Sequence, residues 1–401
     1  MIELAAAGER PVDERAVRAY RLGRLRRLLA EADLGAMVIL DPVNLRYATG
    51  SRNMQVWTMH NACRYVFVAA EGPVVLFDLP SSMHLSPGLE TIDERRPSLA
   101  WDFMAVGSRG PEMAGRWAAE IADLLRRHAG PSARLAIDRA DLPPLEALAH
   151  EGVTAVDGKP VIERARAVKS PEEVRAFVAS LRSTEAAIGE LRALLKPGMT
   201  EQEALAILIA GSLRRGGEYP ETRLLTAGPR TNPWFQETSD RPMTAGEILS
   251  FDTDMIGPMG FYTDLSRCLL VGDGRPTDAQ RRLYDLARRQ LARNIELLRP
   301  GAGFFEIAEK SFRLPDSCLP NRYADIAHGC GLGVEYPLIW YPEDAEWGAY
   351  DGHLEAGMIV CVESYVGEVG GREGVKLEEP ILVTEQGPVK LSSDPLEERF
   401  A

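Results

Sequence analysis

The sequence predicts a two-domain α+β protein, with a smaller α/β domain over residues 1–165 and a larger domain over residues 166–401. Three observations lead to this prediction. At 401 residues the chain is long enough for two hydrophobic cores. Short apolar runs alternate with helical patterns in the first part. In the second part, long helical patterns flank strand-like runs that carry carboxylates.

The first domain is expected to hold a small sheet covered by helices. Its expected elements are an arginine-rich helix over 13–33, strands near 35–41, 64–70 and 73–79, a helix over 112–128 and a strand over 133–138. The alternation of these patterns is typical of an α/β arrangement.

Three helices of the second domain are predicted from capping boxes. In each, a Ser or Thr side chain can cap the helix while an acidic or amide residue three positions on reaches back. The pairs are Ser170 with Glu173, Thr200 with Glu203, and Thr277 with Gln280. Turn-forming residues end the three helices at 196–198, 216–217 and 300–301.

Six residues of the second domain stand out as candidate metal ligands: Asp252, Asp254, Asp264, His328, Glu363 and Glu378. Five are carboxylates in short apolar runs. If ILSFDTDMI forms one strand, its period of two places Asp252 and Asp254 on the same face. The turn at 257–260 would then return Asp264 alongside them.

A cluster of this kind requires cations. Two unit charges about 4 Å apart repel by roughly 4 kcal/mol at an effective dielectric constant of about 20. An oxygen-rich set with one histidine suits Mn, Fe(II), Co or Zn. Two ions could then activate a water or clamp a developing oxyanion. The alternative is that these residues are scattered surface acids of an acidic chain.

Composition excludes several classes of protein. The net charge of −13 argues against binding to nucleic acid or to anionic membranes. The first residues show no signal-peptide pattern, and no apolar run approaches the length of a membrane span. Five cysteines without paired spacing indicate reduced thiols and a cytoplasmic protein.

Four motifs resemble those of the creatinase/aminopeptidase P/prolidase family and occur in the same order. They are GFYTDLSR, HGCG, VES and VKLEEPILVTEQG. This resemblance implies a pita-bread catalytic domain after a creatinase-like amino-terminal domain. It also implies two divalent metal ions (Fe, Mn, Zn or Co) held by the six residues above, a small-molecule substrate and a homodimer.

One branch of the family is more similar to this chain than the other branches are. Asp252-Thr253-Asp254 has an Asp on either side of the position where relatives carry one. Intervals of 64, 35 and 15 residues then separate Asp264, His328, Glu363 and Glu378. Both features resemble the pita-bread dimethylsulfoniopropionate (DMSP) lyases, which form dimethyl sulfide and acrylate. The same resemblance implies that Tyr323 is an active-site tyrosine.

The chain departs from its relatives at two places. Trp234 stands where peptidases of the family carry a substrate-binding histidine. Val334 stands where the lyase branch is thought to carry an aspartate base. The base would then be the neighbouring Glu335, Tyr323, or a hydroxide held by the metal ions.

Aromatic residues are the candidates for substrate binding, because a sulfonium cation favours an aromatic wall. These candidates are Trp57, Trp234 and Tyr262, with core packing as the alternative for each. Arg267 is expected to form a structural ion pair. Lys376 and Glu379 are expected to be solvated.

The leading prediction for function is therefore a metal-dependent lyase similar to DMSP lyases. The alternative is a hydrolase on the same scaffold, of the Xaa-Pro peptidase or small-amide kind, which needs no base for an α-proton. A non-catalytic binding protein is a third hypothesis, disfavoured because such a protein need not keep a full ligand set.

Overall fold

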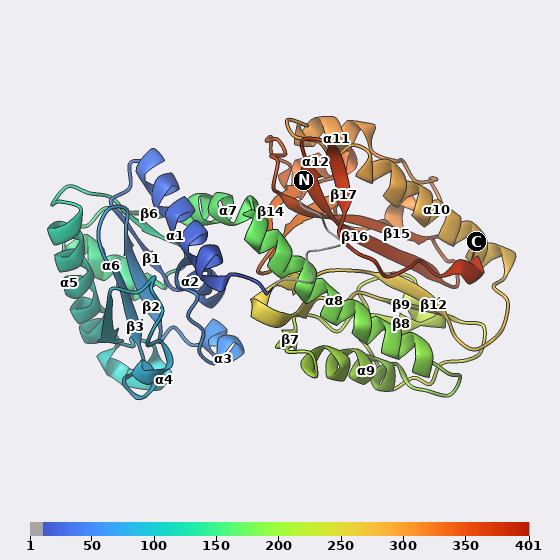
Figure 1. Cartoon of the computed structure of the whole chain (residues 1–401), viewed down its shortest axis with the longest axis horizontal. Coiled ribbons are helices and arrows are strands. Elements are labelled where there is room, and N and C mark those ends of the chain that lie inside the picture. Colours follow the sequence, from blue (N-terminus) through green and yellow to red (C-terminus); the bar gives the residue numbers. More distant parts are fainter. Residues whose placement is uncertain (1–10, 401) are drawn as a thin grey trace. The chain divides into compact units, whose positions relative to one another are not determined.

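The structure is a computed structural model that describes residues 11–400. It divides into two compact units, Asp13–Arg166 and the chain from Ala167 onward (Figure 1). Residues 1–10, part of the segment in which no signal peptide was predicted, lie outside the described residues. Within the described part, no helix combines the length and the apolar character needed to cross a membrane.

The first unit holds a six-stranded sheet in the order β4-β3-β2-β1-β5-β6. Its strands are β1 (Ala36–Ile39), β2 (Tyr65–Ala69), β3 (Val74–Asp78), β4 (Glu94–Pro97), β5 (Leu135–Ile137) and β6 (Ala155–Asp157). Its helices are α1 (Glu14–Glu31), α2 (Pro42–Thr49), α3 (Gln55–His60), α4 (Phe103–Val106), α5 (Gly110–His128), α6 (Leu142–His150) and α7 (Lys159–Ala167). A buried aromatic group of Tyr65, Trp101 and Trp117 contributes to the core between α5 and the sheet.

The second unit combines three antiparallel sheets with long helices. Its helices are α8 (Pro171–Leu194), α9 (Glu201–Leu213), α10 (Asp278–Ile295), α11 (Phe304–Lys310) and α12 (Ala345–Gly348). The main sheet has the order β14-β13-β15-β16-β17. Its strands are β13 (Ala327–Cys330), β14 (Val334–Ile339), β15 (Ile359–Gly367), β16 (Gly374–Thr384) and β17 (Gly387–Lys390).

Two three-stranded sheets carry the aspartate segment. The first has the order β12-β9-β8 and the second has the order β11-β10-β7. Their strands are β7 (Tyr219–Pro220), β8 (Leu225–Ala227), β9 (Ile248–Phe251), β10 (Met255–Ile256), β11 (Tyr262–Thr263) and β12 (Arg267–Leu270). The strands β9 and β12 also contact β16 of the main sheet, so the sheet β12-β9-β8 and the main sheet lie together in a central layer.

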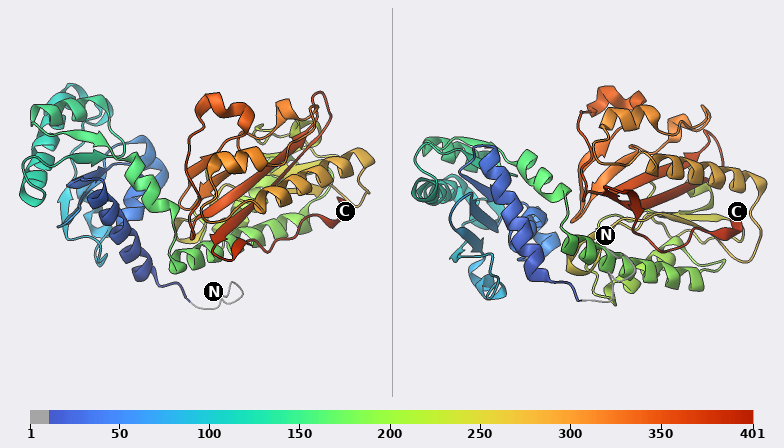
Figure 2. Two further views of the ribbon diagram at one scale, coloured as in Figure 1. Left: turned by 90° about the horizontal axis from the view of Figure 1, so that it is seen from above. Right: turned by 45° about the horizontal axis from the view of Figure 1, so that its top comes forward.

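Helices cover this layer on both sides. Figure 1 shows α10 on one side of the strands and α8 with α9 on the other, and the right-hand view of Figure 2 shows the same layering. The helix α10 packs Leu291 into a core that also contains Val362 and Val366 of β15. Each such side chain contributes roughly 1.5–3 kcal/mol by leaving water, so β15 and β16 form a rigid base for any site they carry.

The three predicted capping boxes are confirmed. Ser170, Thr200 and Thr277 each accept a hydrogen bond from the backbone N–H three residues on, and the side chain at that position accepts from the cap. The helices α8, α9 and α10 begin directly after these residues, as the sequence predicts.

The prediction of one continuous strand through Asp252 and Asp254 is wrong. The strand β9 ends at Phe251 and β10 begins at Met255, because Asp254 adopts a left-handed backbone with φ of 41°. The partner strands are interrupted at the matching place, since Phe251 pairs with Arg267 and Met255 with Thr263. Residues 252–254 on one segment and residues 264–266 on its partner segment therefore lie between the two regions of regular strand pairing.

Candidate metal centre

The main sheet contributes two carboxylates from neighbouring strands. Glu363 of β15 and Glu378 of β16 are direct partners in the antiparallel register. Residues that face each other in this way project their side chains to the same side of the sheet. Both glutamates are fully buried. The sheet alone therefore holds two like charges side by side, away from water.

The break in the smaller sheets contributes three more carboxylates. Oxygen atoms of Asp252, Asp254 and Asp264 lie within 4.8 Å of one another. Oxygens of Asp252, Glu363 and Glu378 form a second group of the same size. The structure thus gathers all five predicted carboxylates into one cluster, although the strand geometry that was expected to do so is absent.

His328 completes the cluster from β13, which pairs with β15. Its Nε2 lies 3.4 Å from Asp264 Oδ2, 3.5 Å from Glu363 Oε1 and 3.7 Å from Glu378 Oε1. Its Nδ1 lies 3.1 Å from the carbonyl oxygen of Gly329. This contact leaves Nε2 facing the carboxylates, which is the orientation a metal-ligating histidine requires.

The donor set fits a metal ion. One oxygen each of Asp252, Asp264, Glu363 and Glu378 is buried without a hydrogen-bond partner. Buried acceptors are normally satisfied, so four unpartnered carboxylate oxygens in one cluster indicate that a cation belongs among them. Four oxygens with one imidazole nitrogen suit Mn, Fe(II), Co or Zn.

Lys376 is also part of the cluster, and the prediction that it is solvated is wrong. Its side chain is fully buried, and Nζ lies 2.6 Å from Glu363 Oε2, 3.0 Å from Asp252 Oδ2 and 3.3 Å from Glu378 Oε2. A sequence signal was present, because Lys376 and Glu378 are two residues apart in a strand and so share a face. The lysine thus places a positive charge inside the carboxylate group.

The electrostatics of the cluster follow from burial and crowding. Burial would raise the pKa of Asp252, but the Lys376 ammonium lowers it to about 2. Burial and the neighbouring Asp252 raise the pKa of Asp254 to about 7. Burial and the Glu378 charge hold the pKa of Asp264 well above its ordinary value. Burial and crowding thus disfavour the charged forms of Asp254 and Asp264, and a bound cation would favour them.

Hydroxyl groups hold Asp254 on both sides. The Tyr262 hydroxyl donates to Asp254 Oδ1 and the Thr222 hydroxyl donates to Oδ2, both in short hydrogen bonds. Tyr262 was predicted to bind substrate, but the structure places it buried behind this carboxylate. Its hydroxyl is committed to orienting Asp254.

The aromatic residues beside the cluster differ in exposure. Trp234 is buried against Tyr365, with ring centroids 5.8 Å apart. Its neighbour Phe235 is 55% exposed and lies 5.2 Å from the Tyr323 ring, centroid to centroid. The Tyr323 ring in turn lies 4.4 Å from Lys376 Nζ. A chain of close contacts therefore runs from the exposed Phe235 ring through Tyr323 to the buried Lys376.

The two positions considered for the base have different surroundings. Val334 is 53% exposed. Glu335 is buried and forms a short ion pair with Lys169, which is buried as well. The groups of potential ligands described above do not include Glu335. Its carboxylate forms an ion pair with the Lys169 ammonium.

The remaining predictions concern residues outside the cluster. Trp57 lies on α3 of the first unit and is 43% exposed, so the core-packing alternative is wrong for this residue. Arg267 forms buried ion pairs with Glu379 and Asp394, which confirms the predicted structural role. Glu379 is buried by the same pair, so the prediction that it is solvated is wrong.

Asp325 is a buried carboxyl group that the sequence interpretation missed. It lies three residues before His328, and its Oδ1 has no hydrogen-bond partner. Burial raises its pKa to about 7, opposed by the His328 charge and reinforced by Glu363. No motif distinguishes this aspartate in the sequence, since only the fold brings it toward the histidine.

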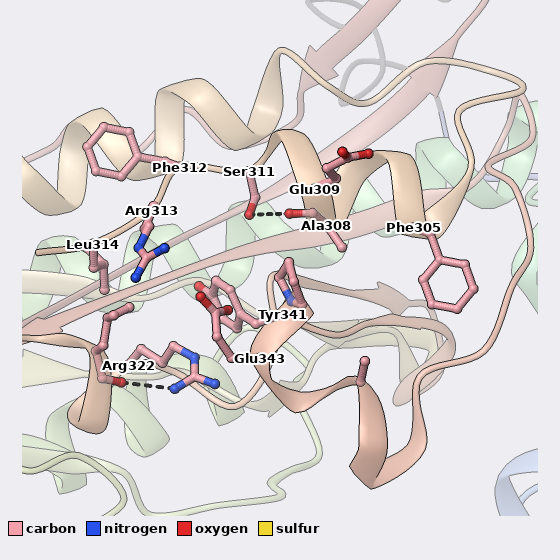
Figure 3. Close-up of a pocket in the computed structure, with 13 residues that line it drawn as sticks. Phe305, Ala308, Glu309, Ser311, Phe312, Arg313, Leu314, Arg322, Tyr341 and Glu343 are labelled. Atoms are coloured by element: carbon pink, nitrogen blue, oxygen red, sulfur yellow. Dashed lines mark hydrogen bonds between the residues drawn. The ribbon is translucent and has the colours of Figure 1, made fainter. Parts of the chain in front are cut away.

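A separate surface cavity of about 400 Å³ lies over α11 (Figure 3). Phe305, Phe312 and Arg322 are among the residues that line it. Arg322 lies 2.5 Å from an oxygen of Asp344 and also donates to the Leu319 carbonyl. None of the six predicted ligands lines this cavity, so the metal chemistry does not belong to it.

The chain is similar to known families and proteins. Residues 176–385 match metallopeptidase family M24, and residues 21–168 match the creatinase/prolidase N-terminal domain. The dimethylsulfoniopropionate lyase DddP of Roseovarius nubinhibens is 37% identical over 400 residues, which cover 98% of this chain and 90% of that protein. The probable dipeptidase PepE of Mycobacterium tuberculosis is 27% identical over 394 residues, with 95% and 96% covered.

Solved structures agree on the fold. The Xaa-Pro dipeptidase from Bacillus anthracis superimposes with a TM-score of 0.76 at 17% identity, over 95% of this chain and 99% of that one. The fold and the carboxylate cluster define a metalloenzyme of the pita-bread class, as predicted. The chain belongs to metallopeptidase family M24 and carries the family's creatinase-type amino-terminal domain.

Proposed function

We propose that this protein is a metal-dependent lyase that cleaves DMSP to dimethyl sulfide and acrylate. The observation that carries this proposal is the 37% identity with a dimethylsulfoniopropionate lyase over nearly the full chain. The Asp252-Thr253-Asp254 pattern, which distinguishes the lyase branch in the sequence, supports it.

The proposed ligands are Asp252, Asp254, Asp264, His328, Glu363 and Glu378, holding two divalent ions from among Fe, Mn, Zn and Co. The four unpartnered carboxylate oxygens and the facing His328 Nε2 support this assignment. When bound, the metal ions would polarise the substrate carboxylate and make its α-proton more acidic.

The reaction is an elimination. The α-proton leaves, the electrons of its C–H bond form the new C=C bond, and sulfur departs with the electrons of the C–S bond. Tyr323 is the proposed proton-handling residue. Burial and the Glu363 charge raise its pKa well above the ordinary tyrosine value, and the Lys376 charge opposes this rise. In its ionised form, which a nearby cation favours, the Tyr323 oxygen would accept the α-proton that leaves the substrate. Glu335 is the less favoured candidate, because Lys169 holds it.

The sulfonium group is proposed to lie against aromatic rings. Phe235 supports this most directly, since its ring is exposed beside Tyr323. Trp234 and Tyr262 are proposed to shape the pocket from behind, and Trp57 is proposed as a further substrate contact because its ring is exposed. The family resemblance leads us to propose a homodimer, and the five cysteines without paired spacing lead us to propose a cytoplasmic protein.

A hydrolase of the Xaa-Pro peptidase or small-amide kind is the second candidate. Val334 favours it, because a valine cannot remove a proton and hydrolysis needs no base for an α-proton. The buried pairing of Glu335 with Lys169 points the same way.

The test measures dimethyl sulfide released from DMSP by purified protein loaded anaerobically with Fe(II), Mn(II) or Zn(II). We expect metal-dependent release, lost in His328→Ala and kept in His353→Ala, a matched change at an exposed histidine. Absence of release from metal-replete protein, with cleavage of an Xaa-Pro dipeptide or a small amide, would instead establish the hydrolase.

A further inference from the structure

Asn232 has a buried side-chain amide that makes four hydrogen bonds. Its Nδ2 donates to the carbonyl oxygens of Glu368 and Gly371, each at 2.8 Å. Its Oδ1 accepts from Asn321 Nδ2 and from the Tyr365 hydroxyl, each at 3.0 Å. An asparagine side chain offers two N–H donors and one oxygen with two lone pairs, so the whole bonding capacity of Asn232 is used.

These hydrogen bonds join three parts of the proposed site. The two bonds from Nδ2 attach Asn232 to the turn between β15 and β16, the strands that carry the two proposed glutamate ligands. The bond from Asn321 attaches it to the segment of Tyr323, which follows Asn321 by two residues. Asn232 itself lies three residues before Phe235. One side chain thus connects the glutamate strands, the proposed proton-handling residue and the exposed aromatic ring.

The end of the β15–β16 pair leaves room for this side chain. Gly367 and Gly374 are direct partners where the two strands meet the turn. A Cβ atom at Gly367 would collide with Asn232 Oδ1, and a Cβ atom at Gly374 would collide with the Tyr365 hydroxyl. Glycine at both positions therefore permits a close approach that any other residue would block.

The conformation of Phe235 requires support from its surroundings. Its φ of 66° lies in the left-handed region, which bulky residues rarely adopt. Residues persist in this region where the surrounding structure holds them, and they cluster at ligand sites. The Phe235 ring lies 5.2 Å from the Tyr323 ring, centroid to centroid. The hydrogen bond between Asn232 and Asn321 joins the two segments that carry these rings.

We propose that Asn232 is a positioning residue that, through its hydrogen bond with Asn321, holds the Phe235 ring and Tyr323 at a fixed spacing. In the proposed elimination, the sulfonium group lies against Phe235 while Tyr323 receives the α-proton. Both groups belong to one small molecule, so the two contacts form together only if the two side chains keep their spacing. Asn232 takes no part in bond breaking. This inference rests on the proposed function and adds the residue that aligns its two contacts.

The kinetic test uses Asn321→Ala, which removes one donor to Asn232 and leaves the metal ligands intact. We expect kcat for DMSP to fall roughly 10- to 100-fold, because misplacing a reacting group by about 1 Å can cost this much. We also expect KM to rise, because Phe235 loses its fixed place. In the double variant with Phe235→Ala, Asn321→Ala should still lower kcat but should raise KM no further. A KM that rises equally with and without Phe235 would overturn the inference.

A matched control separates this role from a loss of stability. Asn294 is a buried asparagine of α10 that accepts a hydrogen bond from the Phe312 backbone N–H. Asn294→Ala should lower the midpoint of urea denaturation while kcat and KM of the folded protein stay unchanged. Circular dichroism establishes that each variant is folded. Asn321 lies on a partly exposed segment, so its replacement tests the inference even if Asn232→Ala does not fold.

A second measurement is independent of activity. Chymotrypsin cleaves after accessible aromatic residues, and mass spectrometry locates cleavage after Phe235. This cleavage should be roughly 2- to 10-fold faster in Asn321→Ala, as loss of one hydrogen bond favours local opening, and unchanged in Asn294→Ala. Unchanged cleavage in folded Asn321→Ala would overturn the inference. Absence of dimethyl sulfide release from the unmodified protein would contradict the proposed function, whereas faster cleavage in Asn321→Ala would still support the role of Asn232 in holding Phe235.

Discussion

Glu363 and Glu378 face each other across the antiparallel pair β15–β16 with both carboxylates fully buried. Like charges directly opposite in a sheet are destabilising. Burial and the Glu363 charge accordingly hold the pKa of Glu378 well above its ordinary value. A cation between the two glutamates removes this repulsion, so metal binding and stability are linked through this pair.

Metal removal is therefore expected to destabilise the fold. A ligand that binds only the native state at 100 times its dissociation constant stabilises it by about 2.7 kcal/mol. The thermal midpoint of metal-replete protein should fall when EDTA is added and should recover with excess Mn(II). His328→Ala serves as the control, because it should show little response to EDTA. Equal midpoints with and without metal in the unmodified protein would contradict the prediction.

Metal affinity is expected to weaken as the pH falls. The pKa values of Asp264 and Glu378 are raised by burial and mutual repulsion, and that of Asp254 is raised to about 7. A metal ion binds the deprotonated forms, so protons must leave as it enters, and the affinity should drop by roughly tenfold per pH unit for each proton displaced. Calorimetry of Zn(II) binding in buffers of different ionisation enthalpy would count these protons, and a buffer-independent heat would disprove the prediction.

Phe235→Ala is expected to weaken substrate binding. Loss of one cation–π contact, worth about 0.5–2 kcal/mol, should raise KM for DMSP by roughly 2- to 30-fold. The kcat should change little, because Phe235 touches neither the proton nor the metal ligands in the proposed reaction. Phe305→Ala, at an exposed phenylalanine of α11, is the matched control. An unaltered KM in Phe235→Ala would place the sulfonium group elsewhere.

Glu335→Gln is expected to reduce stability but not turnover. Breaking a buried ion pair by removing one partner typically costs about 3–5 kcal/mol. Lys169→Met breaks the same pair from the other side, so both variants should lower the midpoint of urea denaturation. Activity of the folded protein should survive in both. If Glu335 is the base, Glu335→Gln alone should lose about 10²- to 10⁴-fold in kcat.

The sequence predicts the helix starts and the six clustered residues because these depend on local patterns. A capping box needs only two residues three positions apart, as at Ser170 and Glu173. The break at Asp254 could not be predicted in the same way. A left-handed backbone is usually indicated by a glycine in the sequence, and here the residue is an aspartate.

The burial of Lys376 and Asp325 could not be predicted for a related reason. A lysine and a glutamate on the same face of a strand are normally predicted to be exposed to solvent. Only knowledge that both faces of the strand are covered would change this prediction. Here β9, β12 and α10 lie against β16, and every residue from 374 to 383 is buried. Asp325 lies in a short connection before β13, where sequence patterns do not indicate whether a side chain is buried.

Three of the proposed metal ligands lie on strands, whereas two aromatic residues of the proposed substrate site lie in loops. This difference affects which residues of the protein can be replaced. His328, Glu363 and Glu378 stand on paired strands of one sheet, whereas Phe235 and Tyr323 lie outside every helix and strand. Loops tolerate replacement far better than paired, buried strands do. Exchanging the two connecting segments that carry Phe235 and Tyr323 would therefore change the surroundings of a substrate while the paired strands keep His328, Glu363 and Glu378 in place.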